Sequence, residues 1–145
     1  MSHQDLIPIL QVAVGPVILI SGVGLLLLSM TNRFGRIIDR TRQLTNERRL
    51  AVPENHESLV AQLRILLRRA RIVRAAIAFA AVSLLLAALL IIVLFTSAIL
   101  QLGLVLSITG LFVACLVSLI ASLVLFIGDI NVSLTALKLE VGSLE

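Results

Sequence analysis

The sequence predicts an all-α, polytopic membrane protein with three transmembrane helices and a cytoplasmic helical hairpin that extends the first and second of them. Of the 145 residues, 59% are hydrophobic, and the mean hydropathy is +1.13. Long uncharged runs alternate with one basic segment, and all eleven arginines lie in it, between Arg33 and Arg74. A soluble domain of this size has too much surface for its volume to hide so many apolar side chains. A soluble fold, a disordered tail and a DNA-binding module are therefore poor interpretations.

Residues 1–5 are expected to form a short outer tail, and residues 6–30 the first transmembrane helix. The 25 residues from Leu6 to Met30 carry no charge. At ~1.5 Å per residue they are about 37 Å long as a helix, enough to cross a ~30 Å hydrocarbon layer with some tilt. The leader has no Lys or Arg, which favours a retained anchor over a cleaved signal peptide.

Residues 31–74 are expected to form the basic cytoplasmic hairpin. Apolar residues recur at helical spacing between Arg33 and Leu50, which predicts a helix that continues the first span. A stop is expected at residues 51–53, and a second helix with acidic residues at its start then runs into the second span. Eleven arginines less four acidic residues give this segment a net charge of +7.

The remaining runs predict a second transmembrane helix at residues 75–100 and a third at residues 101–127, with Gln101 in a very short connection. Residues 128–145 are expected to form an amphipathic tail helix. Its apolar stripe consists of Ile130, Leu134, Leu137 and Val141. Because the tail carries one Lys against three acidic residues, it is predicted to dock on the basic hairpin, with a helix in the membrane interface as the alternative.

The clustered arginines also predict an orientation. Arginine-rich segments that flank spans stay on the cytoplasmic side, so the N-terminus is expected outside and the C-terminal tail inside. Asp39 is expected to make a fixed ion pair with Arg36 or with the second helix rather than to act in catalysis. Two groups of polar residues are candidate sites. One would ring a cytoplasmic mouth or bind lipid: Asn32, Arg33, Arg36, Asp39 and Arg40. The other would carry basic charge facing lipid: Arg69, Arg71 and Arg74.

Small and polar residues line one stripe of each span, where helices in a bilayer approach closely. In the first span they form a candidate pore-lining or packing face that also includes a proline: Gln11, Gly15, Pro16, Gly22 and Ser29. The second span offers Ala76, Ala80, Ser83 and Ala87. The third offers Gly103, Ser107, Gly110, Ala114, Ser118 and Ala121. Cys115 is expected to pack as a small apolar residue.

Catalytic chemistry has little support in the sequence. The three spans contain no ionisable side chain, whereas proton-coupled pumps usually need one. Walker, HExxH and CxxC motifs are absent, and neither His3 nor His56 has a second ligand at metal spacing. We therefore expect no catalytic residues, no metal site, no cofactor and no enzymatic activity.

Several stretches resemble a known family. They are Val14-Gly15-Pro16-Val17 through Gly24, the run from Asn32 to Arg42, Leu125 to Asp129, and Ala136 to Glu140. Together they resemble the small bacterial membrane proteins grouped as domain-of-unknown-function 2721, over nearly the whole chain. The stretch from Arg33 to Arg40 is the most specific part, whereas Asp129 and Asn131 depart from the residues that the family prefers. The resemblance implies a bacterial inner (plasma) membrane protein of three spans and carries no established activity.

Two functions are expected from these features. The first is a non-enzymatic homo-oligomer whose first span lies nearest the axis and which conducts small ions like a channel. The alternative is a non-conducting membrane scaffold or regulator whose basic hairpin binds anionic lipid or a protein partner. In both interpretations the partners are membrane lipids and further copies of the chain, and no nucleic acid is expected.

Overall fold

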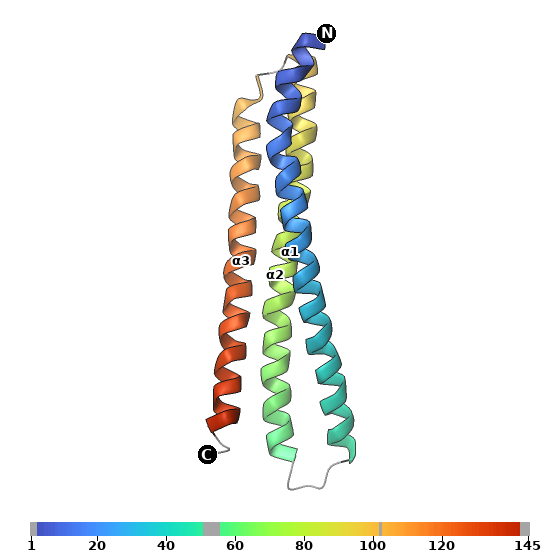
Figure 1. Ribbon diagram of the computed structural model, residues 1–145, viewed down its shortest axis with the longest axis vertical. Coiled ribbons are helices and arrows are strands. Elements are labelled where there is room, and N and C mark those ends of the chain that lie inside the picture. Colours follow the sequence, from blue (N-terminus) through green and yellow to red (C-terminus); the bar gives the residue numbers. More distant parts are fainter. Residues whose placement is uncertain (1–2, 51–55, 102, 143–145) are drawn as a thin grey trace. The chain divides into compact units, whose positions relative to one another are not determined.

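The computed structural model describes residues 3–50, 56–101 and 103–142, with side chains for 7–8, 10–49, 57–101 and 103–133. These residues form three long α-helices (Figure 1). Helix α1 spans His3–Leu50, α2 spans His56–Leu100 and α3 spans Val105–Gly142. All three are long and apolar enough to cross a membrane. The all-α class and three helices that could span a membrane are thereby confirmed, and the protein is a membrane protein.

The helices are longer than the expected spans. Helix α1 begins at His3, within the expected outer tail, and continues through Pro8 and Pro16 to Leu50. Helix α3 runs from Val105 to Gly142 without a break after the apolar run. The expected stop at residues 51–53 lies outside the described residues, as do the side chains of Leu134, Leu137 and Val141 in the tail stripe.

The chain divides into two compact units, and each contains parts of all three helices. One comprises Met1–Leu28 and Ala78–Ala121, and the other comprises Ser29–Ile77 and Ser122–Glu145. The first holds most of the apolar runs, while the second holds all eleven arginines. The candidate site described below lies wholly within the second unit.

Burial follows a heptad pattern in the helices. In α2 the buried residues alternate at steps of three and four: Val73, Ala76, Ala80, Ser83, Ala87 and Leu90. In α1, Ala13 is buried, and from Val23 onward the buried residues recur every seven residues: Val23, Met30, Ile37 and Leu44. A repeat of 3.5 residues keeps one narrow seam facing its neighbours, as in coiled coils. The predicted stripe of α2, with its alanines and Ser83, is thus confirmed as a packing surface.

Helix α3 packs through a face that only partly coincides with the one expected. Its buried residues are Cys115, Ser118, Ser122 and Asp129. Most of the expected stripe is exposed instead: Gly103, Ser107, Gly110 and Ala114. Ser118 of the expected stripe is confirmed as a packing residue, whereas the four exposed residues were predicted wrongly. The observed face carries Ser and Cys side chains that bond to backbone carbonyls of α2.

These bonds form a ladder between α2 and α3. Ser118 donates to the carbonyl of Phe79 at 2.8 Å, and Ser122 donates to the carbonyl of Ala76 at 2.7 Å. Ser83 Oγ donates to the carbonyl of Cys115 at 3.1 Å, while Cys115 Sγ donates to the carbonyl of Ser83 at 3.3 Å. Such interhelical bonds contribute about 0.6 kcal/mol each in a membrane protein. They fix the antiparallel register of the two helices. Cys115 is buried, as expected, but it also takes part in this polar contact.

The connection between α2 and α3 depends on Gln101. Its φ of 51° lies in the left-handed region, where glycine is usual after a helix end. The side chain offsets part of the cost of this backbone conformation, because its Nε2 donates to the carbonyl of Ala98 at 3.1 Å. Gln101 therefore caps α2 as well as reversing the chain.

Candidate functional site

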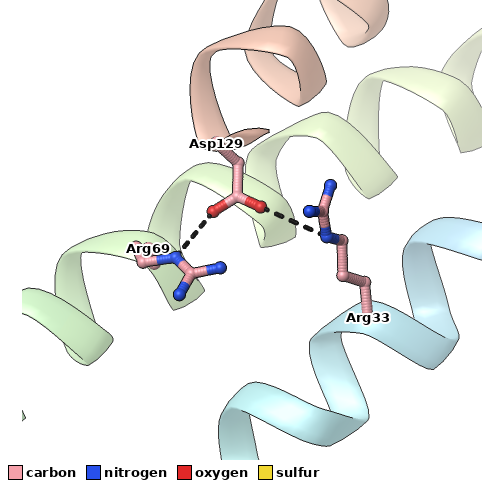
Figure 2. Close-up of polar contacts among 3 residues, drawn as sticks. All are labelled: Arg33, Arg69 and Asp129. Carbon is pink, nitrogen blue, oxygen red and sulfur yellow. Dashed lines mark hydrogen bonds and ion pairs between the residues drawn. The ribbon is translucent and has the colours of Figure 1, made fainter. Parts of the chain in front are cut away.

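A buried carboxylate shared by two arginines is the most distinctive polar feature of the second unit. Figure 2 shows Asp129 of α3 between Arg69 of α2 and Arg33 of α1. Arg69 Nε donates a hydrogen bond to Asp129 Oδ1 at 3.2 Å, and Arg33 Nε lies 3.7 Å from Oδ2. The Asp129 side chain is 0% exposed, while those of Arg33 and Arg69 are 27% and 18% exposed. One acidic residue thus links all three helices.

The helical register brings these residues together. Ser122 bonds to Ala76, and a step of seven residues along each antiparallel helix leads from that pair to Asp129 and Arg69. Ser122 also contacts Met30 Sδ at 3.9 Å, and Arg33 follows Met30 by one helical turn. The seam that packs apolar and hydroxyl side chains therefore also contains a charged layer.

Arg33 has a second contact on α3. Its Cζ lies 5.4 Å from the centroid of the Phe126 ring, and Phe126 precedes Asp129 by three residues, so both lie on one helix face. A guanidinium over an aromatic face gains roughly 0.5–1 kcal/mol at an exposed site and more where water is excluded. The ring therefore helps to hold Arg33 beside the carboxylate.

The charge balance of this layer is incomplete. Oδ1 of Asp129 accepts a hydrogen bond, whereas Oδ2 is buried without one and is balanced by the ion pair to Arg33. Removing a charge from water costs several kcal/mol, and the partners must supply that energy. Two arginines around one aspartate leave a net charge of +1 in the layer.

An arginine-lined pocket adjoins this layer. It has a volume of about 300 Å³ and is formed by α1 and α2. Its lining consists of four arginines and two aliphatic residues: Arg33, Arg36, Ile37, Arg40, Leu66 and Arg69. Arg40 Nη1 donates to Gln43 Oε1 at 3.0 Å. A pocket with this lining suits an oxyanion, because guanidinium groups present parallel N–H donors that match carboxylate and phosphate oxygens.

The expected basic residues divide between this pocket and the outer surface. Arg36 and Arg40 are exposed and line the pocket, whereas Asn32, Arg71 and Arg74 are exposed outside it. Arg33 and Arg69 line the pocket as well and also contact Asp129. The antiparallel register puts Arg69 opposite a buried carboxylate, and the expectation that it faces lipid stays a prediction.

Asp39 does not form its expected ion pair among the described residues. It is exposed, and both ion pairs among the described residues belong to Asp129. The expected pair with Arg36 is absent from this described part of the chain. An exposed aspartate remains well hydrated, so a surface pair gains little. The neighbouring Arg40 bonds to Gln43 instead.

The candidate face of α1 lies on the outside of the protein. Gln11, Gly15, Gly22 and Ser29 are all exposed, and a Cβ added at either glycine would meet nothing within 4 Å. Pro16 departs from this face. It is half-buried and lines an apolar pocket of about 230 Å³ with residues from α2 and α3. Four of the five residues thus remain available to contacts outside the protomer.

Asp129 is the site residue that the sequence analysis did not select. It follows the apolar run by two residues, which suggested a membrane exit rather than a buried partner. Extending the heptad from Ser122 by seven residues would have located it on the packing face. Within the described residues, no group of three His, Cys, Asp or Glu side chains could hold a metal ion.

Comparison with known proteins gives one result that bears on identity. No curated protein and no solved structure matches the chain. Residues 13–139 match the family described as protein of unknown function (DUF2721). This range includes the arginine-lined pocket, Asp129 and nearly all of the three spans. The chain therefore belongs to the DUF2721 family of proteins of unknown function.

Proposed function

We propose that this protein is a non-enzymatic scaffold or regulator of the bacterial inner membrane that attaches to anionic lipid through its basic segment, residues 31–74. The observation that carries the proposal is the convergence of Arg33, Arg36, Arg40 and Arg69 on one pocket. A basic residue near an anionic membrane surface contributes about 1 kcal/mol of attraction. The segment as a whole carries +7, so its attraction to such a surface is collective.

The proposed orientation agrees with this function. Arginines follow the first apolar run and precede the second, and the positive-inside rule assigns such segments to the cytoplasm. The cytoplasmic leaflet is the one that presents anionic lipid to polybasic segments. The same residues thus account for the topology and for the lipid partner.

Lipid retention tests the proposal. The purified protein in detergent is titrated with phosphatidylglycerol or phosphatidylcholine, and bound lipid is counted by native mass spectrometry. Phosphatidylglycerol should be retained preferentially, and the preference should fall with added salt because ions screen the exposed arginines. Equal retention of the two lipids at low salt would contradict the proposal.

A second candidate is a homo-oligomer that conducts small ions. It is favoured by the exposure of Gln11, Gly15, Gly22 and Ser29, with open space around both glycines. Several copies around an axis could line a conduit with this face, whereas three packed helices have too little interior to enclose one. Ion flux into liposomes should then occur with the wild type and be lost in Gln11→Leu and Gly22→Leu. Flux that is absent from the wild type, or equal in all three, argues against conduction.

A further inference from the structure

A further arginine-lined pocket among the described residues of the second unit differs in construction from the one already described. The pocket already described takes Arg33, Arg36 and Arg40 from α1 and Arg69 from α2. The other has a volume of about 530 Å³ and is lined by residues of α2 alone: Arg64, Ile65, Arg68, Arg71 and Ile72. A ligand in the first pocket would contact two helices, whereas a ligand in the second would contact one.

The guanidinium groups in the first pocket are partly held in place. Arg33 and Arg69 contact Asp129 through Nε, and the dashed contacts in Figure 2 do not involve their Nη atoms. Arg33 is held further by the Phe126 ring. Fixing a guanidinium before a ligand arrives lowers the entropy lost on binding.

The net positive charge of this pocket favours an anionic ligand. Four arginines and the adjoining Asp129 give +4 and −1, which leaves a net charge of +3. These charges lie close together around about 300 Å³. A phosphate group supplies negative charge and oxygens that accept bidentate bonds from Arg. A ligand with one exposed phosphate therefore suits the pocket.

The position of the pocket along the helices indicates the source of the phosphate. At ~1.5 Å per residue, Arg33 and Arg36 lie about 4 and 9 Å beyond Met30, where the first apolar run ends, and Arg69 lies about 9 Å before Ala75, where the second begins. The headgroup layer is about 5–8 Å thick on each side of the hydrocarbon. Arg33 thus lies at the depth of lipid phosphates, and Arg36 and Arg69 lie at the outer edge of the headgroup layer, within reach of a phosphate through their long side chains. Arg40 lies further out, about 15 Å beyond Met30.

We propose that this pocket binds one phosphate group, that of an anionic phospholipid, and thereby links α1 to α2 beside Asp129. The proposal rests on the proposed function, attachment to anionic lipid, and adds a defined site to it. Arg36 contacts the phosphate directly, and Arg40 adds positive charge on the side of the pocket away from the apolar run. Asp129 is a positioning residue, because it orients Arg33 and Arg69 without touching the ligand.

Two matched double variants test the site. Arg36→Gln/Arg40→Gln removes two exposed arginines of the two-helix pocket, and Arg64→Gln/Arg68→Gln removes two from the single-helix pocket. Each pair is spaced by four residues, and both pairs lie roughly 9–17 Å from the nearer apolar run. The two variants therefore match in charge, exposure and depth.

Binding is measured by native mass spectrometry with phosphatidylglycerol, phosphatidylcholine or inorganic phosphate as the probe. Loss of Arg36 removes a charge-assisted bond to the phosphate and loss of Arg40 removes a nearby charge, so together they should weaken the first phosphatidylglycerol bound by about 25-fold. The control pair loses only diffuse attraction, which ions screen over about 10 Å, so it should change that affinity by less than about threefold. A third variant, Arg36→Lys/Arg40→Lys, keeps the charge but loses bidentate geometry, so its loss should be intermediate.

The outcomes separate this proposal from the broader one. If the wild type does not distinguish phosphatidylglycerol from phosphatidylcholine, lipid attachment itself is wrong. If it does, and the two glutamine variants lose affinity equally, anionic lipid binds diffusely and the defined site is wrong. If inorganic phosphate binds with the affinity of phosphatidylglycerol and displaces it, the site takes a soluble phosphate and the lipid source is overturned. Unchanged thermal unfolding of both variants confirms that the exposed substitutions leave the fold intact.

Discussion

A carboxylate out of reach of solvent, as in Asp129, persists only where cations and hydrogen bonds replace its hydration. Arg69 supplies a hydrogen bond and Arg33 an ion pair. Such a buried ion pair stabilises a fold weakly compared with apolar residues of the same volume, but removing one of its partners is costly. Its main effect here is geometric, because a register shift in any helix would separate the carboxylate from an arginine.

Replacing Asp129 with Asn should destabilise the protein. The change removes the buried charge and leaves Arg33 and Arg69 facing an amide, so we expect the free energy of unfolding to fall by about 2–3 kcal/mol. Asp39→Asn is the matched control, since Asp39 is exposed and its loss should change stability by less than about 0.5 kcal/mol. Denaturation in detergent, followed by circular dichroism, measures both. Equal stability of the two variants would mean that the ion pairs contribute nothing.

Individual helices owe their packing to the size of the residues along the seam. Ala76, Ala80 and Ala87 of α2 are fully buried. Small side chains allow neighbouring backbones to approach, which replaces the hydrophobic driving force that is missing inside a bilayer. The interhelical bonds of Ser118 and Ser122 require this close approach.

Ala80→Leu should therefore destabilise the helix packing. Three added carbon atoms must fit where Ala80 is 0% exposed, and overpacking typically costs 1–3 kcal/mol, i.e. about 2 kcal/mol here. Ala81→Leu makes the same change on the next residue, which is exposed, and should be nearly neutral. The two variants are compared by thermal unfolding in detergent. A midpoint that falls equally in both would show that the seam does not control stability.

The connection after α2 provides a second prediction about an element. Gln101 has φ of 51°, a conformation that a β-branched residue adopts only with strain. Gln101→Val should lower stability by about 1–2 kcal/mol, because it adds that strain and removes the bond to Ala98. Gln101→Gly loses the same bond but relieves the strain, so it should be close to neutral. A valine variant as stable as the glycine variant would contradict this account.

For each element, the sequence predicted the extent of the helix better than its contacts with the other helices. Uncharged length and helical periodicity are local properties, so the three spans and the continuation of the first to Leu50 could be read directly. The packing face of α3 depends on the carbonyls of α2 that its side chains meet. Residue size therefore could not show that Ser122 and Asp129, rather than Gly110 and Ala114, lie on the face that packs against α2. Arg69 and Asp129 are 60 positions apart, and their pairing follows only from the antiparallel register.

At the scale of the whole molecule, the outward face of α1 is the surface we expect to join copies. Gly22→Leu should leave each protomer stable, because a Cβ at Gly22 meets nothing within 4 Å. It should weaken the proposed oligomer, since a bulky residue forces two backbones apart. Crosslinking in native membranes and in detergent measures the number of copies, and circular dichroism checks the fold. An unchanged number of copies would exclude this face from assembly.

The orientation of the whole molecule in the membrane can be tested by cysteine labelling, because the native cysteine is buried. Cys115 is buried and bonded to Ser83, so a thiol reagent should label introduced cysteines with little background. Gln62→Cys lies among the arginines and Gly103→Cys lies beyond the opposite end of α2, and both positions are exposed. Eleven arginines on the side of Gln62 predict that this side is cytoplasmic. A membrane-impermeant reagent added to intact cells should therefore label Gly103→Cys, and Gln62→Cys only after the membrane is permeabilised. Labelling of Gln62→Cys in intact cells would reverse the topology and place the arginine-lined pocket away from the cytoplasmic leaflet.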